Sequence, residues 1–181
     1  IVLREKGIHQ PAREELRAVL AAAPNSPEAH AALAVLLDKM GRHGEAEPHH
    51  RRALSLANTA EHHNNLGFCL FLQRRYDDAR RELEQAIRLD PAMRRAFNNL
   101  GFVHGVQGER EAALQAFRQA GSPAMAWTNL GVAEEMRGQP QRARRCYEKA
   151  LRAQQDYAPA LRNLRALERQ SAPEADENKE E

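Results

Sequence analysis

The sequence predicts an all-α protein built from repeated pairs of helices, and two regularities support this prediction. The first is the string Asn-Asn-Leu-Gly-Phe, which is centred on Leu66 and returns centred on Leu100. A third copy, Thr-Asn-Leu-Gly-Val, is centred on Leu130, so the spacings are 34 and 30 residues. Self-similarity with a period of about 20–50 residues is typical of stacked repeats. A length of 181 residues allows one ordinary domain or one short array of such repeats.

The second regularity is a fixed series of small and large residues after each of these strings. Seven or eight residues further on stands a glycine, at Gly41, Gly108 and Gly138. A helix that ends in a left-handed C-cap favours glycine at this position. In one unit Arg74 takes the place of the glycine. Alanines then flank one bulky residue, which lets two antiparallel helices approach closely while the bulky side chain fills the gap. The series comprises Ala46, His50, Ala53; Ala79, Leu83, Ala86; Ala113, Phe117, Ala120; and Ala143, Tyr147, Ala150.

Together these positions resemble the tetratricopeptide repeat (TPR), a helix-turn-helix unit of about 34 residues. The resemblance implies a solenoid that winds as a right-handed superhelix over residues 1–170. The units it implies are a partial one over 1–26, complete ones over 27–59, 60–93, 94–123 and 124–157, and a capping helix over 158–170. Residues 171–181 are acidic and without apolar periodicity, which predicts a disordered tail.

Prolines predict where several helices begin. A Ser-Pro or Asp-Pro pair provides an N-cap followed by a proline at the first helical position. Such pairs are Ser26-Pro27, Asp90-Pro91 and Ser122-Pro123. Three further prolines, Pro11, Pro48 and Pro140, are expected in or near the first turn of second helices, where a missing N–H does little harm. The unit over 94–123 is short, so we expect its second helix to be clipped.

Composition excludes several classes of protein. No apolar run approaches the ~20 residues that a membrane-spanning helix needs. The two cysteines, Cys69 and Cys146, form no disulfide framework or metal-ligand spacing, and we expect both to be small buried hydrophobes. Because Ile1 lies inside a helical pattern and no leader is visible, we expect the chain to be a trimmed piece, with any signal or lipid-anchor segment upstream.

The charge pattern does not favour a nucleic-acid partner. The net charge is +2, and residues 171–181 carry five acidic groups against Lys179, which leaves +6 on the remainder. Much of this charge comes from arginines, including the pairs Arg51-Arg52, Arg80-Arg81 and Arg144-Arg145, all expected on second helices. No aromatic residues interleave these arginines to stack bases, so we interpret them as a solvated outer face with ion pairs along each helix.

Neither a metal site nor a catalytic site is predicted. The adjacent histidines His49-His50 and His62-His63 point about 100° apart on a helix, so neither pair chelates one ion easily. His50 and His63 also take places where the repeat has a large ring, which favours packing roles. The glycines between Gly101 and Gly108 lack dinucleotide-loop spacing, and no Walker lysine, HExxH or nucleophile elbow occurs. We therefore expect a non-enzymatic protein without cofactor, metal ligands or catalytic residues.

The predicted binding surface is the inner face of the first helices, which line the concave groove in the family that the chain resembles. The residues two positions before each central leucine form one row along the groove, the amide ladder, whose amides can pair with a peptide backbone. The residues two positions after each leucine form a second row, the ring ladder, whose rings can receive apolar side chains. The predicted partner-binding residues are Asn64, Phe68, Phe71, Asn98, Phe102, Thr128 and Val132. The expected partner is a protein that presents an extended peptide or a helix.

Two alternatives to this surface stay open. Phe68 and Phe102 also have the character of residues that pack neighbouring helices. An adjacent ladder, Ala32, Asn65, Asn99 and Asn129, is weaker evidence for a groove, because asparagine is common there in the repeat itself. The groove lacks the Lys and Arg with which related clamps hold acidic C-termini of chaperones, so a desolvated carboxylate would gain little there.

The run from Asn98 through the Ala-Gly-Ser-Pro of 120–123 to Gly131 is similar to TPR lipoproteins of bacterial Flp/tight-adherence and type IV pilus assembly. That resemblance implies a role in secretin assembly at the periplasmic face of the outer membrane, with membrane attachment only through an anchor upstream of Ile1. Two other functions remain open: a substrate-presenting arm of a larger enzyme such as a glycosyltransferase, and a chaperone or adaptor in the cytoplasm.

Overall fold

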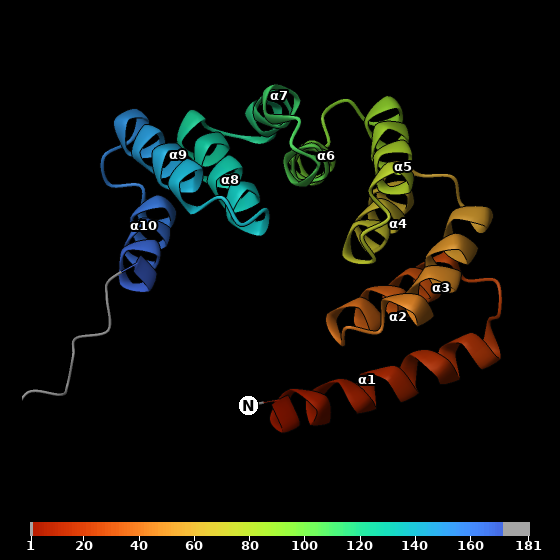
Figure 1. Cartoon of the computed structure of the whole chain (residues 1–181). Coiled ribbons are helices and arrows are strands. Elements are labelled where there is room, and N and C mark those ends of the chain that lie inside the picture. Colours follow the sequence, from red (N-terminus) through yellow and green to blue (C-terminus); the bar gives the residue numbers. More distant parts are fainter. Residues whose placement is uncertain (1, 172–181) are drawn as a thin grey trace, which may run out of the picture. The chain divides into compact units, whose positions relative to one another are not determined.

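The computed structural model describes the backbone of residues 2–171 and the side chains of residues 10–170, and this part is all-α, as predicted. It contains ten helices and no strand (Figure 1). The helices are α1 (Val2–Ala22), α2 (Pro27–Lys39), α3 (His43–Leu56), α4 (Ala60–Leu72), α5 (Tyr76–Leu89), α6 (Arg94–Gln107), α7 (Arg110–Ala120), α8 (Pro123–Met136), α9 (Pro140–Ala153) and α10 (Ala158–Ser171). Residues 172–181, where the disordered tail is predicted, lie outside the described part.

The chain divides into two compact units, residues 1–103 and residues 104–181, and the division falls within α6. In the first unit α2 packs against α3 and α4 against α5, while α1 covers α2. In the second unit α8 packs against α9, and α10 lies against both. Each helix pair is therefore a helix-turn-helix, and α10 covers a face of the last pair.

Serine and threonine side chains start several of these helices. The hydroxyl of Ser26 accepts a hydrogen bond from the Ala29 N–H at 3.1 Å, and Ser122 accepts one from Met125 at 3.2 Å. Both predicted Ser-Pro caps are confirmed. The predicted start at Asp90-Pro91 is wrong, because α6 begins only at Arg94. Asp90 instead accepts from the Ala92 N–H at 3.0 Å in a turn that precedes the helix.

One of the predicted proline positions is also wrong, because Pro11 lies inside the continuous helix α1. Pro48 is the sixth residue of α3, just past its first turn and near it, as expected. At Pro48 the helix lacks the N–H that would reach the Gly44 carbonyl. Pro140 does start α9, and α7 is the clipped second helix that was expected, with 11 residues against 14 in α5 and α9.

The turns after four first helices use left-handed backbone. Gly41, Gly108 and Gly138 have φ angles of 72°, 88° and 69°, which confirms the predicted C-caps. Arg74 takes the same conformation at φ 61° in the turn between α4 and α5. A side chain at Cβ disfavours this region by about 1–2 kcal/mol, so this turn is held against a local cost.

The repeated alanines and leucines form the core as the periodicity predicts. In the first unit Leu66, Leu70, Ala79 and Leu83 pack with Leu100 and Val103 in one buried cluster. In the second unit Tyr147 and Ala143 pack with Leu167 of α10. The glycines after the central leucines permit close packing, because a Cβ at Gly131 would lie 2.4 Å from Cε1 of Tyr147.

Candidate functional site

A pocket of about 410 Å³ opens in the first unit between α2, α3 and α4. Its walls combine three apolar side chains with charged and amide groups, and its lining residues are Val35, Asp38, Lys39, Gly41, His43, His50, Asn65, Phe68 and Leu72. Two of the helices that line this groove pocket, α2 and α4, are first helices of successive pairs, and the sequence predicts the binding groove on first helices.

Phe68 provides the apolar side of the groove pocket. Its side chain is 41% exposed, although neighbouring positions of α4 are buried. The ring stacks on Phe71 with centroids 6.4 Å apart, and Phe71 in turn contacts Tyr76 at 5.8 Å. Phe71 itself packs against the core cluster of Leu66 and its neighbours. The exposed ring is therefore held from behind by aromatic contacts.

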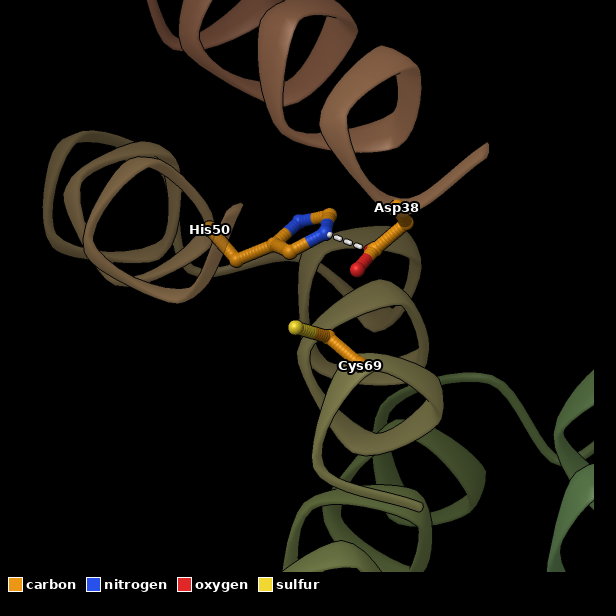
Figure 2. Close-up of side chains that lie close together, drawn as sticks. All are labelled: Asp38, His50 and Cys69. Carbon is orange, nitrogen blue, oxygen red and sulfur yellow. Dashed lines mark hydrogen bonds and ion pairs between the residues drawn. The ribbon is translucent and has the colours of Figure 1, made fainter. Parts of the chain in front are cut away.

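Asp38 forms the polar floor of the groove pocket. Its carboxylate accepts a hydrogen bond from Nδ1 of His43 at 2.9 Å. It accepts a second one from Nε2 of His50 at 2.8 Å, and the thiol of Cys69 lies close by (Figure 2). Burial acts to raise the pKa of Asp38, but the hydrogen bonds from His50 and His43 outweigh it and the pKa lies below its usual value. The floor therefore carries a buried carboxylate that stays ionised at neutral pH.

Cys69 is not a reactive thiol in this setting. Burial, together with the Asp38 charge, raises its pKa to about 12, so the sulfur stays protonated at neutral pH. Cys146 is buried as well, and burial raises its pKa despite the nearby Arg110. The prediction that both cysteines are buried is confirmed, and neither is poised for nucleophilic chemistry.

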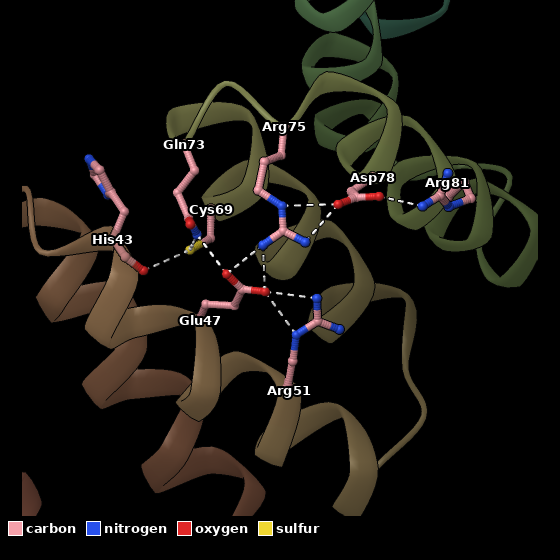
Figure 3. Close-up of polar contacts among 8 residues, drawn as sticks. All are labelled: His43, Glu47, Arg51, Cys69, Gln73, Arg75, Asp78 and Arg81. Carbon is pink, nitrogen blue, oxygen red and sulfur yellow. Dashed lines mark hydrogen bonds and ion pairs between the residues drawn. The ribbon is translucent and has the colours of Figure 1, made fainter.

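A charged network ties α3 to the turn between α4 and α5 beside the groove pocket (Figure 3). Glu47 pairs with Arg51 at 2.7 Å and with Arg75 at 2.8 Å, and Arg75 also reaches Asp78 at 2.6 Å. Gln73 donates to Glu47 at 3.1 Å. Burial acts to raise the pKa of Glu47, but hydrogen bonds from Arg51, Gln73 and Arg75 keep it below the usual value.

The amide ladder predicted from the sequence turns toward the protein interior. Asn64 is only 2% exposed; its Oδ1 accepts from Asn99 at 3.0 Å, and its Nδ2 donates to Asn65 at 3.2 Å. Thr128, at the same repeat position, is buried and donates its hydroxyl to the Ala124 carbonyl at 2.8 Å. Asn98 is half-buried. The groove pocket is lined instead by Asn65, from the ladder that sequence reasoning ranked lower.

The ring ladder is divided between surface and core. Phe68 lines the groove pocket, whereas Phe102 is half-buried and Val132 packs against the cluster of Ala143, Tyr147 and Leu167. Val35, which the sequence places at the same repeat position as Phe68, also lines the groove pocket. Lys39 and Leu72 join them in the lining without having been predicted as groove residues. The helical period could have found Leu72, because it follows Phe68 by one turn of α4.

In each arginine pair one member lies at the surface with an acidic partner on its own helix, as expected. Arg51 pairs with Glu47 and Arg144 with Glu148, each four residues apart on one helix. Sequence reasoning missed the buried carboxylate of Glu134 in the second unit, which pairs with Arg110 and Arg137. Among the described residues, no helix is both long and apolar enough to cross a bilayer.

Comparison with known families settles the class of repeat. Descriptions of the tetratricopeptide repeat match residues 27–92, 70–123 and 124–157. The chain belongs to the tetratricopeptide repeat family. Both the solenoid class and the family resemblance inferred from the spaced leucines, glycines and alanines are thereby confirmed.

Two curated relatives share part of this TPR chain. Over 102 residues, 55% of the chain, it is 37% identical to the Type IV pilus assembly protein PilF of Pseudomonas aeruginosa, of which the match covers 40%. Over 67 residues, 37% of the chain, it is 36% identical to Small glutamine-rich tetratricopeptide repeat-containing protein 2 of Saccharomyces cerevisiae, of which it covers 17%. The chain thus spans less than half the length of either relative.

Solved structures with a similar fold are also TPR proteins. The crystal structure of MamA superposes with a TM-score of 0.68 at 27% identity, over 86% of this chain and 94% of that one. The structure of Pseudomonas aeruginosa PilF gives a TM-score of 0.64 at 24% identity, over 92% and 82%. YrrB, described as a TPR protein with an unusual peptide-binding site, superposes with a TM-score of 0.64 at 20% identity, over 90% of this chain and 87% of that one. The last two likenesses concern the fold alone.

Proposed function

We propose that this TPR protein holds a peptide segment of a partner protein in the groove pocket, with Phe68 as the apolar anchor. We further propose that the partner is a component of bacterial pilus assembly. The broader role is that of a protein-interaction scaffold, as is usual for TPR arrays.

The observation that carries the proposal is the exposed ring of Phe68 at the edge of a 410 Å³ pocket. Aromatic side chains held in one orientation are frequent anchors of binding sites, because they bury a large area at little entropic cost. Contacts through Phe71 to Tyr76 limit the freedom of this ring before a partner arrives. An apolar side chain of the partner would therefore find a preformed surface formed by Phe68, Val35 and Leu72.

Polar groups around the same pocket fit a peptide backbone. The side chain of Asn65 offers both a donor and an acceptor, and Lys39 offers a cation at the rim. The buried carboxylate of Asp38 is already bonded to His43 and His50, so it adds negative charge at the floor rather than a free acceptor. This mixture favours an extended segment with one apolar side chain over a strongly acidic peptide.

The pilus part of the proposal rests on the similarity to PilF, which is 37% identical over 102 residues. A secretin or another pilus-assembly component is therefore the partner to look for first. Localisation at the periplasmic face of the outer membrane belongs to the same proposal, since it is implied only by the pilus resemblance.

A cross-linked pull-down from the producing cells tests both parts. The baits are the unaltered chain, Phe68→Asp, and Leu89→Asp as a matched control. Leu89 is 45% exposed on α5 and does not line the groove pocket. We expect the unaltered chain and Leu89→Asp to recover a pilus-assembly component and Phe68→Asp to lose it. Equal recovery by all three baits would refute the site, and recovery of unrelated proteins would refute the pilus role.

A further inference from the structure

We propose that Asp38, His50 and Cys69 form a binding site for a divalent transition-metal ion of the zinc type at the floor of the groove pocket. The three residues come from three successive helices, α2, α3 and α4. One carboxylate oxygen, one imidazole nitrogen and the thiol sulfur all lie within 4.8 Å of one another, and Figure 2 shows the three side chains close together. Nothing in the proposed peptide binding requires this arrangement.

The donor set suits zinc and cobalt. Zinc binds thiolate sulfur at about 2.3 Å, imidazole nitrogen at about 2.0–2.1 Å and carboxylate oxygen at about 2.0–2.2 Å, usually as a tetrahedron. Tetrahedral ligand atoms at these bond lengths lie roughly 3.3–3.8 Å apart. The separations of at most 4.8 Å in the cluster thus need only small side-chain rotations to reach this geometry. On binding, the ion would replace the hydrogen bond between Nε2 of His50 and Asp38, with His50 neutral and its one ring proton on Nδ1 instead of Nε2. The charge of the ion would displace the thiol proton of Cys69 to solvent.

Neighbouring side chains are placed to orient two of the three ligands. His43 donates to the second oxygen of Asp38 at 2.9 Å, which leaves the oxygen near His50 to face the ion. The amide of Gln73 donates to the sulfur of Cys69 at 3.5 Å (Figure 3). Such outer contacts fix the orientation of metal ligands and typically change affinity by about 10–100-fold when removed.

Burial and access are both compatible with an ion at this point. His50 and Cys69 are 1% and 0% exposed, and the Asp38 side chain is nearly buried, so the ligands are held in a protected setting. Asp38, His43 and His50 nevertheless line the groove pocket, which provides a path from solvent. A fourth position facing that pocket remains for water or for a donor atom of a bound partner.

The competing explanation is that the same atoms only stabilise the fold through hydrogen bonds. Tag-free, chelator-treated protein titrated with Co²⁺ distinguishes the two, because a cobalt–thiolate bond absorbs in the near ultraviolet and a tetrahedral site gives intense visible bands. We expect one ion per chain and thiolate absorption for the unaltered protein. The histidine pair His30 and His49, which approach within 3.0 Å, contains no sulfur and would not give that signal.

The matched variants are Cys69→Ala and Cys146→Ala, because both cysteines are buried and free but Cys146 lies beside Arg110 rather than histidine and carboxylate. We expect Cys146→Ala to keep the cobalt–thiolate absorption. Cys69→Ala should lose this absorption, and its affinity for Zn²⁺ should fall by at least about 100-fold. An unchanged spectrum in Cys69→Ala, or no binding by the unaltered protein, would overturn the proposal.

A readout on the unaltered protein guards against a variant that fails to fold. X-ray absorption of the zinc-loaded chain should show one sulfur at about 2.3 Å among nitrogen and oxygen ligands. A shell of nitrogen and oxygen alone would overturn the assignment of Cys69, whatever the variants do.

Discussion

The turn between α4 and α5 permits a quantitative test of the energetics of this repeat. Arg74 is exposed and adopts φ 61°, where the three equivalent turns use glycine at 69–88°. Removing its Cβ should relieve about 1–2 kcal/mol of backbone strain. Glycine loses more conformational entropy on folding, by about 0.5–1 kcal/mol. Arg74→Gly should therefore raise the free energy of unfolding by about 0.5–1 kcal/mol.

Urea unfolding followed by circular dichroism measures this change. An unaltered slope of the unfolding free energy against urea concentration would show that the variant and the unaltered protein expose the same surface on unfolding. Thermal unfolding should shift upward by about 2–4 °C per kcal/mol. The reverse variant, Gly138→Arg, serves as the control, because no atom lies within 4 Å of an added Cβ there and only backbone strain is introduced. It should lose a similar amount. Equal or lower stability of Arg74→Gly would show that the left-handed backbone at position 74 carries no cost.

Three further outcomes are expected. Gly131→Ala should lower the free energy of unfolding by about 1–3 kcal/mol in chemical denaturation, because its Cβ would overlap the buried Tyr147 ring; full stability would contradict the packing. Glu134→Ala should lower the free energy of unfolding by about 2–3 kcal/mol. This is less than the ~3–5 kcal/mol expected when one partner of a fully buried ion pair is removed, because Arg110 keeps contact with solvent. A change under about 0.5 kcal/mol would argue against the pair. The folded pKa of Glu47 lies below its ordinary 4.5, so its contribution is present above that pH and is lost as pH falls through the folded value. Glu47→Gln should therefore be destabilising at pH 7, and the difference from the unaltered protein should shrink as the pH falls below 4.5. A pH-independent difference would contradict this assignment.

Features of the fold that recur with the repeat could be predicted from the sequence. The buried alanines, the central leucines and the left-handed glycines each occur several times at fixed spacing, so one pattern identifies them all. The clipped helix α7 was also visible, because Ser122-Pro123 interrupts the period. Asp90-Pro91 was misassigned because an aspartate before proline suits a turn as well as an N-cap, and the choice depends on tertiary packing.

The candidate site was harder to predict because a helix turns about 100° with each residue. Two neighbouring residues of α4 therefore face different surroundings: Asn64 is buried against Asn99, whereas Asn65 lines the groove pocket. Phe68 was identified correctly as a ring on the first helix, but its exposure depends on support from Phe71, which the period alone does not reveal.

Clusters assembled from separate helices lay beyond sequence reasoning. His50 was compared with its neighbour His49, whereas the structure brings it to Asp38 and Cys69, which lie 12 residues before it and 19 after it. Glu134 likewise meets Arg110 only through the packing of α7 against α8. Such contacts occur once in the chain, so no repetition marks them in advance.

Photo-crosslinking shows whether a partner binds at the groove pocket through Phe68. Benzoylphenylalanine would replace Phe68 in one chain and Leu89 in another, and each would be irradiated in the producing cells. Both positions are exposed, but only Phe68 lines the groove pocket. We predict a discrete adduct at position 68 that contains a pilus-assembly component, and none at position 89. The same adducts at both positions, or an adduct only at position 89, would contradict the account.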